Sequence, residues 1–170
     1  MGRNRPKEPT VGFMSNQISV LPLHRGRIAE CYPLAGLALR HCAPEAWETY
    51  ARRHIELRGG PATGIFIAED QLGTILGLLV YQIAERNRLE RAFQVKTLIA
   101  AGPFASGRAK VAQSLVSAEE QAATATGCCS AEVFPPVERG PRETDWWIAL
   151  LMTRGYQQRG PMLAKPLPVL

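Results

Sequence analysis

The spacing between apolar residues differs from one segment of the chain to the next. In the first segments it predicts a strand followed by two helices. Residues 16–22 alternate apolar and polar side chains, as a strand does. Residues 27–40 are expected to be helical with a break near Pro33. A second helix is expected over residues 44–57, because Pro44 suits a first helical turn and apolar residues recur there every three or four positions.

Three strand-like runs rich in Ile, Val, Leu and Phe come next. Residues 63–70 and 73–85 are joined by a short turn and predict a hairpin, and residues 92–102 form the fourth strand of the chain. The longest helix is expected over residues 109–125, where apolar side chains keep helical spacing. A fifth strand is expected over residues 128–135.

Two further elements are expected in the last part of the chain. The Thr144 hydroxyl suits the start of a helix that runs to Gly155, and residues 155–167 predict a final strand or hairpin. A chain of 170 residues fits one domain with one ordinary core. We expect this domain to span residues 15–170 and to follow a disordered leader over residues 1–14, which are polar and hold two prolines.

Composition narrows the class of protein. The charged fraction is 21%, and no apolar run approaches the roughly 18 residues of a membrane helix, so we expect a cytoplasmic protein that does not meet a membrane. The four cysteines show no CxxC spacing and no histidine at a ligand interval, which predicts no metal site. Basic residues outnumber acidic ones by 20 to 15, which favours anionic small molecules or a mild attraction to nucleic acid.

The junction between the fourth strand and the longest helix carries the most chemical information. Residues 101–111 read AGPFASGRAKV. Free backbone N–H groups at a helix start carry the positive end of the helix dipole and bind phosphates well. Small residues at Gly107 and Ala109 leave room for phosphates, and Arg108 and Lys110 add positive charge. The alternative is an ordinary loop with a helix cap at Ser106.

With this order of elements, the chain resembles the GNAT superfamily of acyl-CoA-dependent N-acyltransferases over roughly residues 16–167. Residues 101–111 occupy the place of the family's pyrophosphate loop. Residues 155–160, GYQQRG, are similar to the glycine–aromatic step after the family's fourth helix, and residues 73–83 resemble part of its central hairpin. The resemblance implies one mixed α/β domain, with a mostly antiparallel sheet splayed between its fourth and fifth strands and helices on both faces.

The same resemblance implies acetyl-CoA or another acyl-CoA as the cofactor. It assigns cofactor binding to residues at the end of the fourth strand and in the loop that follows, namely Ile99, Ala101, Ser106, Gly107, Arg108, Ala109, Lys110 and Val111. Backbone N–H groups near Ile99 and Ala101 are expected to polarise the thioester carbonyl. Ser106 stands where the family usually has Arg or Gln, and Val111 stands at its final small residue.

The family's acid–base residues are not matched at their usual positions. Leu151 stands where many members have a tyrosine, and the fourth strand carries no glutamate. The catalytic candidates are therefore Glu132 on the neighbouring strand, Tyr156 after the helix-ending glycine, and Glu90 just before the fourth strand.

The expected reaction is transfer of an acetyl or other short acyl group to a primary amine of a small molecule or peptide, by direct attack in a ternary complex. A second copy of the chain is a further expected partner. Candidates for lining the acceptor pocket are Trp47, Tyr50, Tyr81, Arg86, Trp146 and Trp147. The alternative is a module of the same fold that binds CoA or a protein without catalysis. A third hypothesis, a module that binds nucleic acid, is supported only by the excess of arginine in the sequence.

Overall fold

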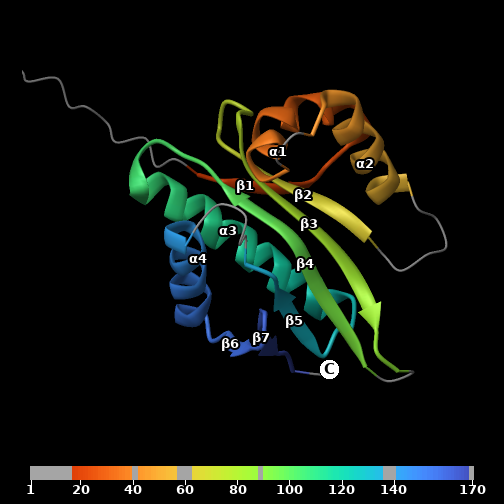
Figure 1. The fold of residues 1–170 in the computed structure, drawn as a ribbon, viewed down its shortest axis with the longest axis vertical. Coiled ribbons are helices and arrows are strands. Elements are labelled where there is room, and N and C mark those ends of the chain that lie inside the picture. The colour runs from red at the N-terminus through yellow and green to blue at the C-terminus, as the bar shows by residue number, and fades with distance from the viewer. Residues whose placement is uncertain (1–16, 40–41, 57–62, 88–89, 136–140, 169–170) are drawn as a thin grey trace, which may run out of the picture.

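A seven-stranded sheet forms the centre of the protein in the computed structural model, which describes residues 17–39, 42–56, 63–87, 90–135 and 141–168 (Figure 1). The expected leader at residues 1–14 lies outside the described residues. The strands are β1 (Ser19–Pro22), β2 (Thr63–Glu69), β3 (Ile75–Glu85), β4 (Arg91–Ala100), β5 (Ser130–Val133), β6 (Gln157–Arg159) and β7 (Met162–Pro166). They lie in the order β1-β2-β3-β4-β5-β7-β6. All neighbours are antiparallel except β4 and β5, which run parallel.

Helices cover both faces of this sheet (Figure 1). On one face lie two short 3-10 turns, Arg25–Arg27 and Ala29–Cys31, followed by α1 (Tyr32–Ala38) and α2 (Pro44–Glu56). On the other face lie α3 (Phe104–Ala125) and α4 (Pro141–Thr153). The mixed α/β fold predicted from the sequence is therefore confirmed.

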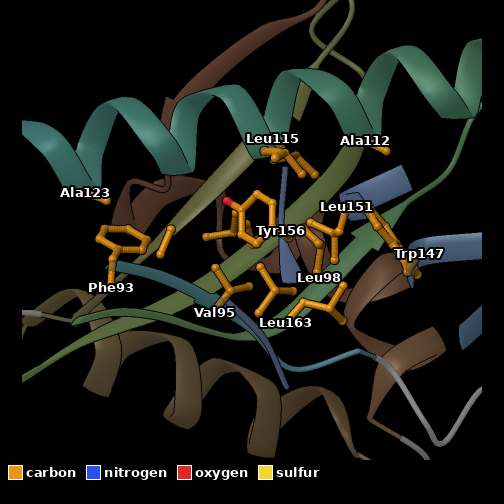
Figure 2. Packing of buried hydrophobic residues seen from close by; sticks show 14 of the residues in the cluster. Phe93, Val95, Leu98, Ala112, Leu115, Ala123, Trp147, Leu151, Tyr156 and Leu163 are labelled. Atoms are coloured by element: carbon orange, nitrogen blue, oxygen red, sulfur yellow. The ribbon is translucent and has the colours of Figure 1, made fainter. Parts of the chain in front are cut away.

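The two faces of the sheet bury separate apolar clusters, because successive side chains of a strand point to opposite faces. Ile65, Leu78 and Ile99 pack with Trp47 under α1 and α2. The larger cluster lies under α3 and α4 (Figure 2), and its members include Phe93, Val95, Leu98, Leu115, Trp147, Leu151 and Leu163. Strand β4 therefore contributes to both clusters and is fixed from both sides.

An extra residue in β4 marks the point where the sheet opens. Val80 lies opposite Thr97 and Tyr81 lies opposite Val95, so Lys96 has no counterpart on β3 and forms a β-bulge. Strand β5 pairs with β4 only as far as Val95, whose carbonyl oxygen accepts from the Phe134 N–H at 3.2 Å. The remaining residues of β4 have no partner on β5 among the described residues. The predicted splay between the fourth and fifth strands is confirmed.

Two predicted helix starts were wrong. Helix α3 begins at Phe104 rather than at residue 109, because Pro103, with extended backbone angles, already serves as its N-cap. Ser106, Gly107 and Val111 therefore belong to its first two turns and not to a loop. Helix α4 begins at Pro141 rather than at Thr144, since proline is well suited to a first helical position.

Two kinds of feature are absent from the described part of the chain. No helix there combines the length and apolar character that crossing a membrane requires. Nor do its histidine, cysteine and acidic side chains gather into a group of three that could hold a metal ion.

We expect Gly77→Ala to destabilise the protein by about 1–3 kcal/mol, because overpacking a close contact forces side chains or backbone to shift. A Cβ atom at Gly77 would lie 2.7 Å from the Val111 Cγ1 and 2.8 Å from the Leu115 Cδ1, where α3 packs on β3. Gly36→Ala on the exposed side of α1 is the control: its Cβ would meet nothing within 4 Å, so stability should be unchanged or higher. Denaturant unfolding measures both, and equal stability of the two variants would contradict the close packing.

Candidate functional site

The free edge of β4 presents backbone groups of Leu98 and Ala100. The Ala101 N–H donates to the Leu76 carbonyl oxygen at 2.7 Å, so this amide points toward β3. Backbone groups two residues apart on a strand point to the same side, which turns Ile99 toward β3 as well and Leu98 and Ala100 toward the side that β5 has left. The sequence led us to expect the amides near Ile99 and Ala101 at the thioester. These amides face β3, and the amides at the free edge are those of Leu98 and Ala100.

The free edge of β4 leads directly into the start of α3. The N–H groups of Phe104, Ala105 and Ser106 occupy the first turn, where a helix offers no internal acceptor, and these three residues are exposed. Phe104 has a φ of 64°, which is rare for an aromatic residue, and its side chain is 87% exposed. The structure thus brings a strand edge and the positive end of a helix dipole within four residues of each other.

Glycine is required at Gly102 in this junction. A Cβ atom at Gly102 would lie 2.8 Å from the backbone nitrogen of Arg108, so the chain before the helix folds closely against its second turn. Gly107 is less constrained, since an added Cβ would come no closer than 3.5 Å to its nearest neighbour, Pro103. The glycine that fixes the junction is therefore Gly102, while the sequence pattern pointed to Gly107.

The other loop residues expected to bind cofactor separate into two groups. Ser106 and Lys110 are exposed, and Ala109 is half-buried on the same helix. Val111 is fully buried and packs on β3 beside Gly77, so its side chain belongs to the core and cannot line a phosphate site. That expectation for Val111 was wrong, because the position lies a full two turns inside the helix and faces the sheet.

Arg108 joins α3 to α4. Its guanidinium forms an ion pair with Glu143, which also accepts from the Trp147 indole N–H at 3.2 Å. The same guanidinium lies 3.9 Å from the ring centroid of Trp146, a cation–π contact. The charge of Arg108 is therefore already balanced inside the protein, and the side chain holds the starts of two helices together.

The two candidate glutamates lie in different surroundings. Glu132 is 1% exposed and accepts hydrogen bonds from Arg86, from the Gln94 amide at 2.9 Å and from the Ser130 hydroxyl at 3.3 Å. Both oxygens of this carboxylate are therefore already engaged by donors of the protein. Glu90 is exposed in the β3–β4 turn, where it accepts from Asn87 at 2.9 Å, and the whole paired half of β4 separates it from the Lys96 bulge.

The third catalytic candidate lies in the core. Tyr156 is 2% exposed, and Figure 2 shows its hydroxyl turned toward α3, in the same cluster as Leu151. Burial, together with the nearby carboxylates of Glu119 and Glu120, raises the pKa of the Tyr156 hydroxyl. That hydroxyl and the Glu119 carboxyl group interact with each other, and neither has a further hydrogen-bond partner within the described ranges. The structure therefore brings Tyr156 to a buried carboxyl group and not to the free edge of β4.

A polar group that sequence reasoning did not assemble lies on the opposite face of β4, beside the bulge. Lys96 donates to the Gln94 side chain at 3.0 Å and lies 4.6 Å above the Phe134 ring. Tyr50 of α2 reaches the side chain of Thr97. The ring centroids of Tyr50 and His54 are 4.1 Å apart. Burial raises the pKa of Tyr50, so its hydroxyl stays protonated and can donate.

Three of the remaining acceptor-pocket candidates are occupied by packing. Trp47 is buried and its indole N–H donates to the Ile28 carbonyl oxygen at 2.8 Å. Trp147 is fully buried, and Tyr81 stacks between Phe66 and Phe93. Tyr50 lies beside the bulge, where it reaches Thr97, whereas Arg86 is partly exposed and pairs with Glu132.

Comparison with known proteins gives structural neighbours but no sequence relatives. No protein-family model matches the chain, and no curated protein matches it by sequence. An aminoglycoside N-acetyltransferase solved with CoA has a TM-score of 0.69 at 12% identity, over 86% of this chain and 91% of that one. A spermidine/spermine N-acetyltransferase from Vibrio cholerae has a TM-score of 0.64 at 16% identity, over 88% of this chain and 95% of that one.

A third neighbour is a ribosomal-protein-alanine N-acetyltransferase from Brucella melitensis biovar Abortus 2308. Its TM-score is 0.57 at 20% identity, over 76% of this chain and 86% of that one. All three similarities extend over most of both chains, so they concern the whole domain and not one motif. At these identities they show the fold, and they confirm the one that the sequence resemblance implied.

We expect Glu119→Met to stabilise the protein at pH 8 by about 1–3 kcal/mol, the cost of burying a polar group whose hydrogen bonding is incomplete. Burial, and secondarily the neighbouring Glu120, raises the pKa of Glu119 well above 4.5, so the folded state holds this proton more tightly than the unfolded chain. The free energy of unfolding should therefore fall as pH rises above 4.5, and the difference between wild type and variant should grow over that range.

Glu119→Gln is the control, because it removes the titration but keeps a buried polar group. Its stability should depend less on pH than that of the wild type, without the full gain of the methionine variant. Denaturant unfolding across pH 4–8 measures all three proteins. Parallel pH profiles for the wild type and both variants would contradict the raised pKa.

Proposed function

We propose that this chain, which has the GNAT fold, transfers an acyl group from an acyl-CoA, with acetyl-CoA as the expected donor, to a primary amine. One observation carries the proposal: β4 loses its β5 partner after Val95 and runs, with a free edge, into the exposed start of α3. An edge of this kind suits an extended ligand with amide groups, and a helix start suits its phosphates. The N-acetyltransferases of the same fold, one of them solved with CoA, support it.

The cofactor would be held by backbone more than by side chains. The N–H groups of Phe104, Ala105 and Ser106 would bind the pyrophosphate, and the exposed Lys110 would add positive charge. The backbone groups of Leu98 and Ala100 would pair with the amides of the pantetheine arm. Arg108 would contribute through its hold on Glu143 and Trp146, which fixes the helix start.

When bound, acyl-CoA supplies a thioester whose carbonyl carbon an amine can attack. The Leu98 N–H, at the free edge just after the bulge, is the donor in this chain best placed to polarise that carbonyl. The new C–N bond forms as the C–S bond breaks, and a proton must pass from the amine to the leaving sulfur. The hydroxyls of Tyr50 and Thr97 lie beside the bulge and would relay it.

A second candidate function is a module that binds CoA without turnover. It is favoured by the surroundings of the three acid–base candidates: Glu132 is held by three donors, Tyr156 is buried in the core and Glu90 lies in the β3–β4 turn. Release of free thiol from acetyl-CoA across a panel of amines, amino acids and peptides separates the two. Binding of acetyl-CoA without thiol release for any of them would favour the module.

We expect Ser106→Glu to weaken acetyl-CoA binding at least tenfold, because it places a carboxylate against the expected pyrophosphate position. The same charge should leave the fold intact or slightly more stable, since acidic side chains are favourable at a helix start. Gln121→Glu, exposed farther along α3, is the matched control and should bind within about twofold of wild type. Calorimetric titration measures both. Unchanged affinity of Ser106→Glu would reject the helix start as the phosphate site, and a wild type that does not bind acetyl-CoA would reject the proposed function.

We expect Tyr50→Phe to lower kcat about tenfold or more while the acetyl-CoA dissociation constant stays unchanged, because it removes only the relaying hydroxyl. The phenyl ring keeps the stacking on His54 and Trp47, so the melting temperature should change little. Steady-state thiol release and calorimetry measure the two constants. A kcat equal to that of wild type would exclude Tyr50 from proton transfer.

A further inference from the structure

The exposed face of the β5-β7-β6 part of the sheet holds a cavity of about 220 Å³. Its lining comes from the residue that follows β3, from β5 and from the β6–β7 hairpin, and includes Arg86, Ser130, Glu132, Arg159, Met162 and Ala164. The cavity has two guanidinium groups and one carboxylate. This charge balance makes it a site for a small ligand group that carries negative charge.

The Glu132 carboxylate forms the floor of this cavity and is held in one position. The carboxylate is 1% exposed and accepts from Arg86, while the Gln94 amide and the Ser130 hydroxyl hold it from two further sides. Its charge is therefore balanced by that of Arg86. The side chain of Arg86 is 48% exposed, so the donors that do not face Glu132 remain open to a ligand.

Arg159 provides the second cation. It lies on β6 directly opposite Met162, in the hairpin that forms the far wall of the cavity, and it is exposed. Among the residues that the structure describes, no carboxylate lies within ion-pair distance of Arg159. A carboxylate placed between Arg86 and Arg159 would supply the missing partner, since the planar guanidinium group pairs with carboxylates through two parallel hydrogen bonds.

The cavity is linked to the free half of β4 by a chain of hydrogen bonds. Gln94 donates to Glu132 at 2.9 Å and accepts from Lys96 at 3.0 Å, and Lys96 is the bulge residue at which β4 and β5 part. The cavity and the bulge thus lie on one face of the sheet, on neighbouring strands. A small molecule held in the cavity would extend toward the position proposed for the thioester.

We propose that this cavity binds the carboxylate of the acyl acceptor, so that the acceptor is a small amine that also carries a carboxylate, such as an amino acid. The proposal rests on the proposed function for the identity of the reaction. A polyamine would bring positive charge to Arg86, Arg159 and Lys96, a repulsive arrangement. The small volume favours a single anionic group over an oligosaccharide or a phosphate-rich polymer.

Binding of a carboxylate is tested without CoA. N-acetylglycine and its uncharged amide, N-acetylglycinamide, have the same shape, and we expect the wild-type chain to bind the acid at least tenfold more tightly in calorimetric titration. Arg159→Gln should abolish this preference. Arg53→Gln, which removes the same charge from the exposed side of α2, should keep it. Equal binding of acid and amide, or tighter binding of inorganic phosphate than of the acid, would overturn the proposal.

The acceptor class is tested by turnover with matched pairs. Lysine and cadaverine differ by one carboxylate, and we expect kcat/KM for lysine to exceed that for cadaverine at least tenfold, with the ratio falling toward one in Arg159→Gln. A preference for cadaverine, or a ratio that Arg159→Gln leaves unchanged, would overturn the proposal. Because the titration with N-acetylglycine needs neither CoA nor turnover, it decides the carboxylate site even where acyl transfer fails, and the two failures are distinguishable.

Discussion

The parting of β4 from β5 at the Lys96 bulge is the constraint on which the rest of the site depends. One residue without a counterpart on β3 bends β4, and β5 follows it no farther than Val95. The backbone of Leu98 and Ala100 is left without a neighbouring strand, yet their side chains remain buried under α3. Packing therefore keeps the free edge rigid, and Gly77 allows α3 to lie close enough to provide that packing.

In the described part of the chain, several of the arginines that suggest an anion-binding surface in the sequence join elements of the fold instead. Arg108 pairs with Glu143 between α3 and α4, and Arg154 pairs with Glu120 at 2.9 Å, where α4 ends beside α3. Pairs that are only partly buried contribute modestly to stability but fix the directions of the elements that they join. The positive net charge of the chain is therefore a weak indicator of an anion-binding site. Basic side chains that lack an ion-pair partner are a better indicator than the net charge.

The sequence was sufficient for the fold because the apolar spacing of each strand and helix agrees with the face that it buries. It was less informative about the site, because the site is made of backbone. Whether the Ile99 or the Leu98 amide faces the gap depends on one extra residue in β4, whose only sign is the adjacent polar pair Lys96 and Thr97 in an apolar run. Likewise, the glycine pattern pointed to Gly107, but the close approach occurs at Gly102, which only the packing of the junction reveals.

The paired state of Glu132 and the positive charge on the side proposed for the acceptor are consistent with each other. A carboxylate near a bound amine would favour the charged ammonium form, whereas nearby cations favour the neutral form that attacks a carbonyl. Lys96, Arg86 and Arg159 all lie on the face of the sheet where the acceptor would bind, and Glu132 is already balanced by Arg86. If the proposal holds, such a site would lower the pKa of the bound amine through its positive field, while a carboxylate on the same molecule would restore the binding energy that the repulsion costs. Positioning can then supply much of the remaining acceleration, because an amine held against a fixed thioester reacts as if at very high concentration.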